Sequence, residues 1–393
     1  MIESATIRSA GAWWGGRYNL KMLRKLASRP DWQIAMTVTV ALRVFYTAMA
    51  AAFLPFLHPD PAAIHSNALT ENLPPPHGLH YALLGIWERF DTLWFLRIAE
   101  HGYDRPMAVI FYPLYPAAIR LVSRLIPATA AALLVSTVAA FFLFWGLLRL
   151  ANSSLTGTGR VRMLLLVAVW PASFALFAGY AESLTIALIV WAVVFARAGR
   201  WWPAALCGSL AGLARPSGVM VAIPLCVLAL RSRRATSLVT FLTPLGLLSY
   251  WGWLRWSGRL SVVEAYRLYQ GMVLAPPWVG VWESVRMPVA QHDVLLAIRL
   301  GLIVLVIALS LRGEVRLEDK LFALAVILQM LLYAGRPAIG AVRYLLPVYP
   351  AFLSLGNYAQ RRRSQKQFSF YVAAFGFLNL VWMWAFLNWS LVL

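Results

Sequence analysis

The stretch PATAAALLVSTVAAFFLFWGLLR at residues 127–149 carries no charge before its last residue, and it decides which class of fold the chain can adopt. A helix needs about 20 apolar residues to cross the roughly 30 Å of hydrocarbon in a membrane. Backbone polar groups in lipid must be paired within the chain, so a stretch of this kind forms a helix. We therefore expect a membrane-spanning helix here.

Further apolar runs fill much of the chain and predict an all-α polytopic membrane protein with about eleven transmembrane helices. Clusters of charged residues separate the runs and give approximate boundaries for each one. No internal repeat or low-complexity linker divides the sequence, so residues 1–393 are treated as a single membrane domain. The further runs lie at about 33–57, 162–179, 181–197, 202–214, 217–230, 236–254, 294–311, 321–335, 343–359 and 368–391.

The composition is that of a chain solvated mostly by lipid. Hydrophobic residues make up 61% and charged residues 13% of the sequence, whereas about a quarter of a soluble domain is charged. The net charge of +20 could indicate nucleic-acid binding, but in so apolar a chain basic residues more often mark cytoplasmic loops, and no nucleic-acid partner is expected. Cys207 and Cys226 lie inside apolar runs and predict neither a disulfide framework nor a thiolate metal site.

Basic residues recur in alternate gaps between the runs and predict the orientation of the chain. Cytoplasmic loops carry an excess of Lys and Arg, so these gaps and the N-terminus are assigned to the cytoplasm. The N-terminal region lacks the pattern of a removable signal peptide, so the first run is expected to remain as an anchor in the cell inner membrane. The basic gaps contain Arg149, Arg160 and Arg162; Arg197 and Arg200; Arg231, Arg233 and Arg234; Arg312, Arg316 and Lys320; and Arg361, Arg362, Arg363 and Lys366.

The opposite gaps include two long loops, residues 58–126 and 255–293, which are expected outside the cytoplasm. These two loops hold all six histidines, and the external side holds most of the acidic residues. Histidines and acids are not needed to set topology, so their concentration predicts that the working face is external.

The first external loop has a helical pattern of its own. Residues 107–126 are apolar but contain two prolines and two arginines, and we interpret them as interfacial or re-entrant, because a span there would invert every later loop. The preceding residues predict one amphipathic helix lying along the membrane surface. Its apolar stripe consists of Leu83, Trp87, Phe90, Trp94 and Ile98.

Asp91 is the predicted catalytic carboxylate. It stands four residues after Trp87 and three before Trp94, so at helical spacing it borders the apolar stripe. A carboxylate in such a partly apolar position suits a general base. The alternative is an ordinary helix-face acid paired with Arg89 or Arg97.

Polar and aromatic residues after Asp91 are candidates for substrate binding. Glu100 and His101 close the same predicted helix, just before a glycine that signals a helix stop. His101 could also shuttle a proton, but the histidines lack the HxxxH or HExxH spacing of a metal site, and no protein-held metal is expected. Tyr112 and Tyr115 alternate with prolines and would form a rigid aromatic ledge for a sugar, although such residues are equally common at a lipid interface.

Further charged residues lie at membrane boundaries, where charge is costly. Glu182 interrupts a long uncharged stretch and needs a partner or a polar cavity, unless it is a solvated loop acid. Arg215 precedes a proline between two short apolar runs, a pattern of broken helices that line polar cavities. Arg336 and Arg343 are external arginines that could bind a phosphate or could snorkel to the interface.

Together these segments resemble the PIG-V family, the second mannosyltransferase of GPI-anchor synthesis, and especially its prokaryotic relatives in the GT-C glycosyltransferase superfamily. The resemblance covers about residues 85–225, with Arg343-Tyr344 before Pro347 as a weaker match. Family members commonly have Trp or Tyr before the aspartate, where this chain has Phe90. The matching segments are Phe90-Asp91 through Trp94-Phe95, Ile98-Ala99-Glu100-His101-Gly102-Tyr103, Phe111-Tyr112-Pro113-Leu114-Tyr115-Pro116, Trp170-Pro171, Gly179-Tyr180-Ala181-Glu182-Ser183 and Ala214-Arg215-Pro216-Ser217-Gly218.

The resemblance implies a GT-C fold with membrane-parallel helices in the first external loop and an active site at the outer membrane surface. Such enzymes move a sugar, here expected to be mannose, from a polyprenyl-phosphate carrier to an acceptor hydroxyl with inversion and without a cofactor. Asp91 would be the general base, and Arg215 and Arg343 would hold the carrier phosphate. The residues expected to bind the sugar or shape the cleft are Glu100, His101, Tyr112, Tyr115 and Glu182.

The expected partners are membrane lipids, the lipid-linked sugar donor and an acceptor that could be a lipid, a protein or a glycan. A transporter or flippase of lipid-linked glycans is the main alternative, because it too would have many spans and broken helices. Such a protein should have repeat symmetry and a central charged cavity, whereas here the charges gather on one face. A non-catalytic assembly protein is a further alternative.

Cysteine labelling tests the predicted orientation. In a background with Cys207 and Cys226 replaced by serine, His65→Cys is expected to react with a membrane-impermeant thiol reagent in spheroplasts, because position 65 lies in the first external loop. Arg363→Cys should react only after the membrane is opened. Reaction at position 363 but not at 65 in sealed spheroplasts would overturn the topology.

Overall fold

The computed structural model describes residues 25–65, 69, 73, 77–291, 294–334, 340–360 and 365–390. Among the described residues 78% are helical, and the only strands are two antiparallel segments of two residues each. The chain is therefore an all-α protein, as the apolar runs predict.

The first half of the chain alternates long helices with short helical segments of the first loop. A 3-10 helix is written η. The elements are α2 (Asp31–Phe53), η2 (Leu54–Phe56), α3 (Pro61–His65), α4 (Gly78–Leu83), η4 (Gly85–Trp87), α5 (Asp91–His101), η5 (Pro106–Ile110), α6 (Leu114–Val122), α7 (Ala128–Ala151), α8 (Gly157–Ala168), η6 (Ser173–Leu176) and α9 (Glu182–Arg197).

The second half adds further long helices and the small strand pair, in which Val273 lies opposite Ala334. Its elements are α10 (Trp201–Ala214), η7 (Pro216–Val221), α11 (Ala222–Ser232), η8 (Ala235–Leu242), α12 (Leu245–Trp256), α13 (Val262–Gln270), β1 (Val273–Leu274), α14 (Pro277–Gln291), α15 (Val294–Ser310), α16 (Leu317–Leu331), β2 (Tyr333–Ala334), α17 (Ala341–Tyr344), α18 (Tyr349–Gln360) and α19 (Gln365–Leu387).

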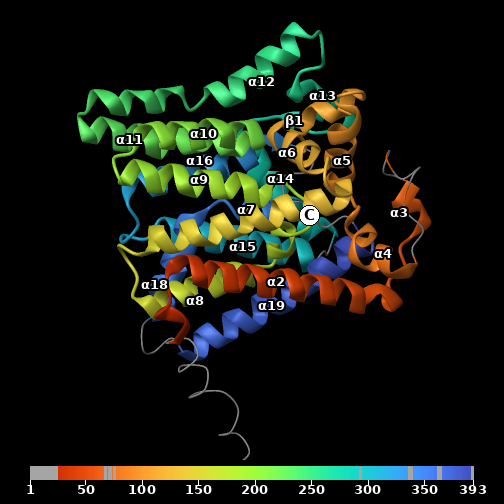
Figure 1. Cartoon of the computed structure of the whole chain (residues 1–393), viewed down its shortest axis with the longest axis horizontal. Coiled ribbons are helices and arrows are strands. Elements are labelled where there is room, and N and C mark those ends of the chain that lie inside the picture. The colour runs from red at the N-terminus through yellow and green to blue at the C-terminus, as the bar shows by residue number, and fades with distance from the viewer. Residues whose placement is uncertain are drawn as a thin grey trace, which may run out of the picture.

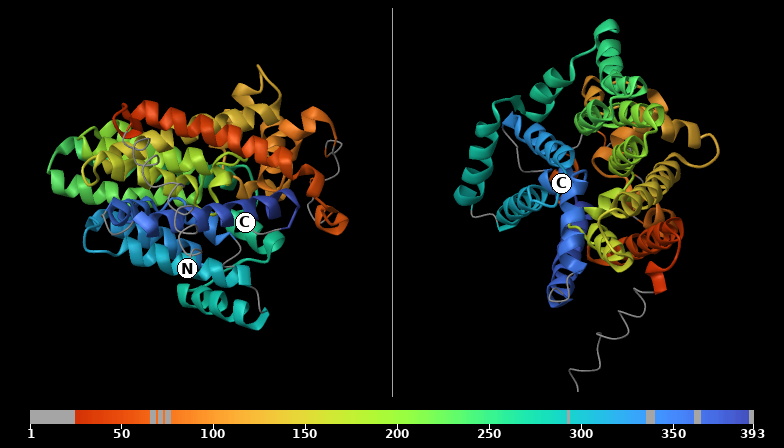
Figure 2. Two further views of the ribbon diagram at one scale, coloured as in Figure 1. Left: turned by 90° about the horizontal axis from the view of Figure 1, so that it is seen from below. Right: turned by 90° about the vertical axis from the view of Figure 1, so that its left-hand side faces the viewer.

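The long helices lie side by side, and the short helices of the first loop gather at one end of them (Figure 1). The right-hand view of Figure 2 looks along the bundle, and many of its helices are seen nearly end-on there. Helix α9 packs between α7 and α10, and α2 covers α7. The main apolar core is built from these helices together with α8, α15, α16, α18 and α19.

Within the part of the chain that the structure describes, three helices are long and apolar enough to cross a membrane: Asp31–Phe56, Ala128–Ala151 and Lys366–Leu387. Helix α7 has 24 residues, which gives a length of about 36 Å. Each of the other apolar runs also contains a helix in the structure, but these helices are shorter or more polar. The structure thus supports a membrane protein, and the larger number of spans stays a prediction.

The amphipathic helix predicted through residues 83–98 is not continuous, so this prediction is wrong in detail. Helix α4 ends at Leu83, η4 covers Gly85–Trp87, and α5 begins only at Asp91. Phe90 interrupts the pattern, because its backbone has φ 48° and ψ −119°. That conformation is rare for a residue with a Cβ atom and is incompatible with a helix. The region predicted as interfacial or re-entrant forms η5 and α6.

Arg89 ties the first loop to the C-terminal helix. Its side chain is buried, and its Nε donates to the carbonyl oxygen of Leu387 at 2.9 Å. Its Nη1 donates to the Ile86 carbonyl at 2.7 Å, and its Nη2 donates to the Tyr81 hydroxyl at 2.9 Å. The guanidinium also lies 5.3 Å from the ring centroid of Trp389. Arg89 is therefore structural and is not the partner of Asp91.

Replacing Arg89 should loosen the first loop without touching the charges around Asp91. We expect Arg89→Gln to lower the stability of the purified protein by at least about 2 kcal/mol, because hydrogen bonds made by a buried charged group are lost. Unfolding in detergent would measure the change, with the exposed Arg120→Gln on α6 as the control. Equal midpoints for the two variants would contradict this role of Arg89.

Candidate functional site

Four charged residues predicted from separate motifs lie together and form what we term the charged cluster: Asp91, Glu182, Arg215 and Arg343. Nη1 of Arg343 lies 2.6 Å from Oδ2 of Asp91. Nε of the same guanidinium lies 3.2 Å from Oε1 of Glu182. Nη1 of Arg215 donates to that same Glu182 oxygen. The two acids and two arginines therefore alternate in one connected array.

The members of the charged cluster differ in exposure. The side chains of Glu182 and Arg343 are 3% and 6% exposed, whereas those of Arg215 and Asp91 are 19% and 27% exposed. Asp91 is therefore the carboxylate that a molecule arriving from outside reaches most easily. Glu182 lies deeper and is shared by both arginines.

Two tyrosines flank the arginines. The Arg343 guanidinium lies 4.9 Å from the ring centroid of Tyr180 and 5.3 Å from that of Tyr344. Arg215 lies 5.3 Å from the Tyr344 ring on its own side. Aromatic faces attract cations, so these rings help to hold both guanidinium groups in place. Neither tyrosine was a predicted site residue, although both lie in segments that carry the resemblance, two residues before Glu182 and directly after Arg343.

Asp91 is held at the start of α5 by an unusual turn. Phe90 has a positive φ, and such backbone conformations cost about 1–3 kcal/mol in a residue other than glycine. The Phe90 ring packs 5.7 Å from Phe386 and 5.1 Å from Trp389, measured between ring centroids. The aromatic packing offsets the strain and fixes the direction in which the first residue of α5 points.

Glu182 occupies the corresponding position in α9, as its first residue. The turn before it passes through Gly179, which has φ +78° and lies so close to Thr92 that a Cβ atom there would be 3.1 Å from Cγ2. Thr92 in turn donates to the Ala178 carbonyl at 2.8 Å. These contacts place the starts of α5 and α9 together. Helix N-termini favour negative charge, so both carboxylates lie where the backbone stabilises them.

Arg215 lies in the predicted helix break. Helix α10 ends at Ala214, Arg215 is extended with φ −158°, and a 3-10 helix follows from Pro216. A Cβ atom on Gly218 would clash with the Ala211 carbonyl, so glycine allows the chain to turn tightly here. Burial alone would lower the pKa of Arg215, but the Glu182 carboxylate raises it above its ordinary value. The side chain therefore remains charged.

Three buried polar atoms in or next to the charged cluster have no hydrogen-bond partner. They are Oε2 of Glu182, Oγ of Ser183 and Nε of Arg343, which is near Glu182 but lacks hydrogen-bond geometry. Most buried polar groups in proteins are paired, so such atoms are suited to a polar ligand rich in hydroxyl or phosphate oxygens. Ser183 was not among the predicted site residues.

Glu100 and His101 lie at the other end of α5, about 14–15 Å from Asp91 along the helix. Their side chains are exposed, and His101 Nε2 lies 3.8 Å from Glu100 Oε2. Nearby, hydrogen bonds from Arg97 lower the pKa of Asp104, so Arg97 is not the partner of Asp91 either. The structure does not bring Glu100 and His101 into the charged cluster.

Tyr112 and Tyr115 are buried and do not form an exposed ledge. The Tyr112 hydroxyl accepts a hydrogen bond from Trp251 Nε1 at 3.0 Å. The Tyr115 hydroxyl donates to the Ala132 carbonyl at 2.9 Å and lies 2.6 Å from Ser136 Oγ. Both side chains belong to the smaller apolar core under the first loop.

Two predictions concern residues or ligands that the geometry does not address. Arg336 lies outside the described residues. Within the described residues, no group of three or more His, Cys, Asp or Glu side chains could hold a metal ion. A metal-independent reaction stays a prediction.

No model of a known protein family matches this chain, and no curated protein matches it. The case for a function therefore rests on the motifs and on the geometry of the charged cluster.

A double-mutant cycle tests whether the charged cluster acts as one unit. Glu182→Gln and Arg215→Gln should each destabilise the protein, because each leaves a partner charge uncompensated. The double variant should lose less than the sum, by about 1–3 kcal/mol, as expected for residues in contact. Unfolding of the purified protein in detergent measures this coupling.

The exposed Arg97 and Asp104 pair is the matched control, and its coupling should be smaller because solvent screens it. Additive effects of the Glu182 and Arg215 substitutions would show that the two residues do not depend on each other.

Proposed function

We propose that this protein is a membrane glycosyltransferase of the GT-C type, similar to prokaryotic relatives of the PIG-V family. It moves a sugar, with mannose as the expected one, from a polyprenyl-phosphate carrier to an acceptor hydroxyl. The motifs at Asp91, at the turn before Glu182 and at the helix break beside Arg215 support this proposal, because these three residues belong to the charged cluster.

One observation carries the proposal: Arg343 contacts Asp91 across 252 residues of sequence while it lies against Glu182. A candidate base and a candidate phosphate-binding group thus stand side by side. A glycosyl transfer from a phosphate ester needs both groups within one sugar ring of each other. A purely structural ion pair would not need an accessible carboxylate, and Asp91 is the most exposed acid of the cluster.

In the proposed reaction Asp91 is the general base. The acceptor hydroxyl attacks the anomeric carbon of the donor, its proton passes to the Asp91 carboxylate, and a new glycosidic bond forms. The bond between the anomeric carbon and the phosphate oxygen breaks at the same time, and the polyprenyl phosphate leaves with the bonding electron pair. Attack from the face opposite the phosphate inverts the anomeric centre.

The two arginines would stabilise the leaving phosphate. Guanidinium groups form two parallel hydrogen bonds to phosphate and stay charged at all relevant pH values. Both guanidinium groups contact Glu182, Arg343 also packs against the Tyr180 ring, and Arg215 packs against the Tyr344 ring. A phosphate that enters beside Glu182 would therefore meet groups whose orientation has been set in advance, which is what transition-state stabilisation requires.

Glu182 and Ser183 would bind sugar hydroxyls through their unpartnered oxygens. Tyr112 and Tyr115 contribute only indirectly, through packing. Glu100 and His101 would contact an acceptor only if it extends about 15 Å along α5.

The location follows from the same proposal. We place the chain in the cell inner membrane with about eleven spans, a cytoplasmic N-terminus and the charged cluster at the extracytoplasmic face. The carrier chain would lie in the membrane beside the bundle. The acceptor would approach from the first loop, on the side where Asp91 is exposed.

Sugar transfer by purified protein tests the proposal. With polyprenyl-phosphate-mannose as donor, total membrane lipid as acceptor and a chelator present, the wild type should form labelled product. Asp91→Asn should lower the rate by at least about a hundredfold, the usual scale for a general base. Asp104→Asn is the control, because Asp104 is an acid of the same loop that pairs with Arg97 instead.

Near-normal turnover by Asp91→Asn would contradict the assignment of the base. Absence of product from the wild type with mannose and glucose donors alike would contradict the glycosyltransferase proposal. Movement of intact labelled donor across the membrane of proteoliposomes would then favour the transporter.

A further inference from the structure

A second group of charged residues lies at the end of α9 away from Glu182. Arg197, the last residue of α9, places Nη2 2.7 and 2.6 Å from the two carboxylate oxygens of Asp319 in the first turn of α16. The Tyr349 hydroxyl donates to Asp319 at 2.5 Å, and Arg231 donates to Glu318 at 2.8 Å. These contacts hold the ends of α9, α11, α16 and α18 together.

A small pocket opens beside these residues, and part of it is open to solvent. The Arg197 and Asp319 pair lines one side. Glu314 and Arg316, from the loop before α16, are exposed and stand at the mouth. Apolar side chains of α7 and α18 complete the lining with several polar groups. The pocket is thus bounded by two cations, two anions and apolar surface.

Ser354 on α18 gives an independent indication of a ligand. Its side chain lines the pocket and is 0% exposed, yet its Oγ atom has no hydrogen-bond partner. A buried hydroxyl without a partner costs free energy that a ligand oxygen or ammonium could recover. The charged groups at the mouth and this hydroxyl inside line the same pocket.

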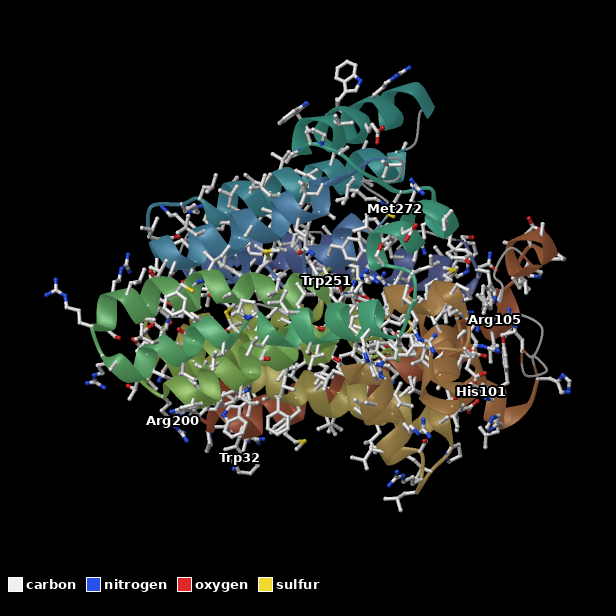
Figure 3. The ribbon with its side chains drawn as sticks, turned by 90° about the horizontal axis from the view of Figure 1, so that it is seen from above. Trp32, His101, Arg105, Arg200, Trp251 and Met272 are labelled. Atoms are coloured by element: carbon white, nitrogen blue, oxygen red, sulfur yellow. The ribbon has the colours of Figure 1, made fainter. Side chains whose placement is uncertain are left out.

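The position of the pocket relates it to a membrane surface. Helix α7 is long and apolar enough to span a membrane and ends at Ala151, directly before the pocket residues Ser153 and Ser154. Figure 3 shows Arg200, three residues beyond the end of α9, at the end of the bundle opposite His101. The pocket therefore lies at the headgroup level of the leaflet opposite the charged cluster.

We propose that this pocket binds the headgroup of a zwitterionic phospholipid that carries a primary ammonium, as phosphatidylethanolamine does. Arg316 binds the phosphate and Glu314 binds the ammonium. Ser354 bonds an ester or phosphate oxygen, and Leu150 and Leu353 contact the first acyl carbons. The inference does not depend on the chemistry at Asp91.

The charge balance favours this headgroup over others. The four ionisable lining residues, Arg197, Glu314, Arg316 and Asp319, sum to zero, so an anionic headgroup would bring an uncompensated negative charge next to two carboxylates. A choline headgroup has the same phosphate but no N–H group with which to donate to Glu314. Glu314 lies 3.3 Å from Arg312, and the two side chains are 30% and 37% exposed, so solvent screens this pair.

Lipid binding to the purified full-length protein tests the proposal, with native mass spectrometry to measure the fraction of protein that carries each lipid. Phosphatidylethanolamine should bind at least about tenfold more tightly than phosphatidylcholine or phosphatidylglycerol of the same chains, a ratio that corresponds to about 1.4 kcal/mol. Glu314→Gln should remove this preference and leave phosphatidylcholine binding unchanged. Ser354→Ala, a small change in the interior, should weaken phosphatidylethanolamine binding several-fold.

Glu264→Gln is the control, because Glu264 is an exposed acid on α13, away from the pocket lining. Equal binding of the three lipids, or an unchanged preference in Glu314→Gln, would overturn the proposal. Soluble phosphoethanolamine that displaces the lipid at equal concentration would show that the acyl chains add nothing, and it would overturn the assignment to a lipid.

Discussion

The arrangement of the candidate site depends on one guanidinium. Arg343 bonds to Asp91 and lies against Glu182, and its side chain is almost fully buried. A buried arginine is tolerated only when opposite charges surround it, because desolvation costs several kcal/mol per ion. The starts of α5 and α9 must therefore both face α17. The long-range order of the chain and the local chemistry of the cluster are consequences of the same electrostatic requirement.

Helix α9 relates the two charged regions of the molecule. It carries an acid as its first residue and an arginine as its last, and no charge in between. Glu182 joins the charged cluster, and Arg197 joins Asp319 about 22 Å away along the helix. Negative charge at the N-terminus and positive charge at the C-terminus both suit the helix dipole. Helix α9 is therefore apolar along its length, and its two charged residues lie at opposite ends of the bundle.

The sequence predicts the helices well because backbone hydrogen bonding in an apolar run leaves few alternatives. It also locates the break at Arg215, where proline cannot continue a helix. The predicted continuous helix fails at Phe90. Apolar spacing indicates which side of a helix a residue lies on, but it gives no information about the backbone angle φ. The sequence also fails for Glu100 and His101, because neighbours in a motif lie far apart when a helix of eleven residues separates them. The positions of Tyr180 and Tyr344 depend on long-range packing that no local pattern records.

The strained turn makes the C-terminal helix part of the candidate site, although it is almost 300 residues away in sequence from Asp91. Phe386 and Trp389 pack on the ring of Phe90, which has the unfavourable backbone conformation. Arg89 binds the carbonyl of Leu387 between them. Aromatic packing and a charged hydrogen bond therefore act on two consecutive residues directly before Asp91. A turn without strain would need no aromatic packing to stabilise it. It would, however, allow the Asp91 carboxylate to move away from Arg343. We interpret the strain as the cost of fixing one carboxylate against one guanidinium at a partly exposed surface.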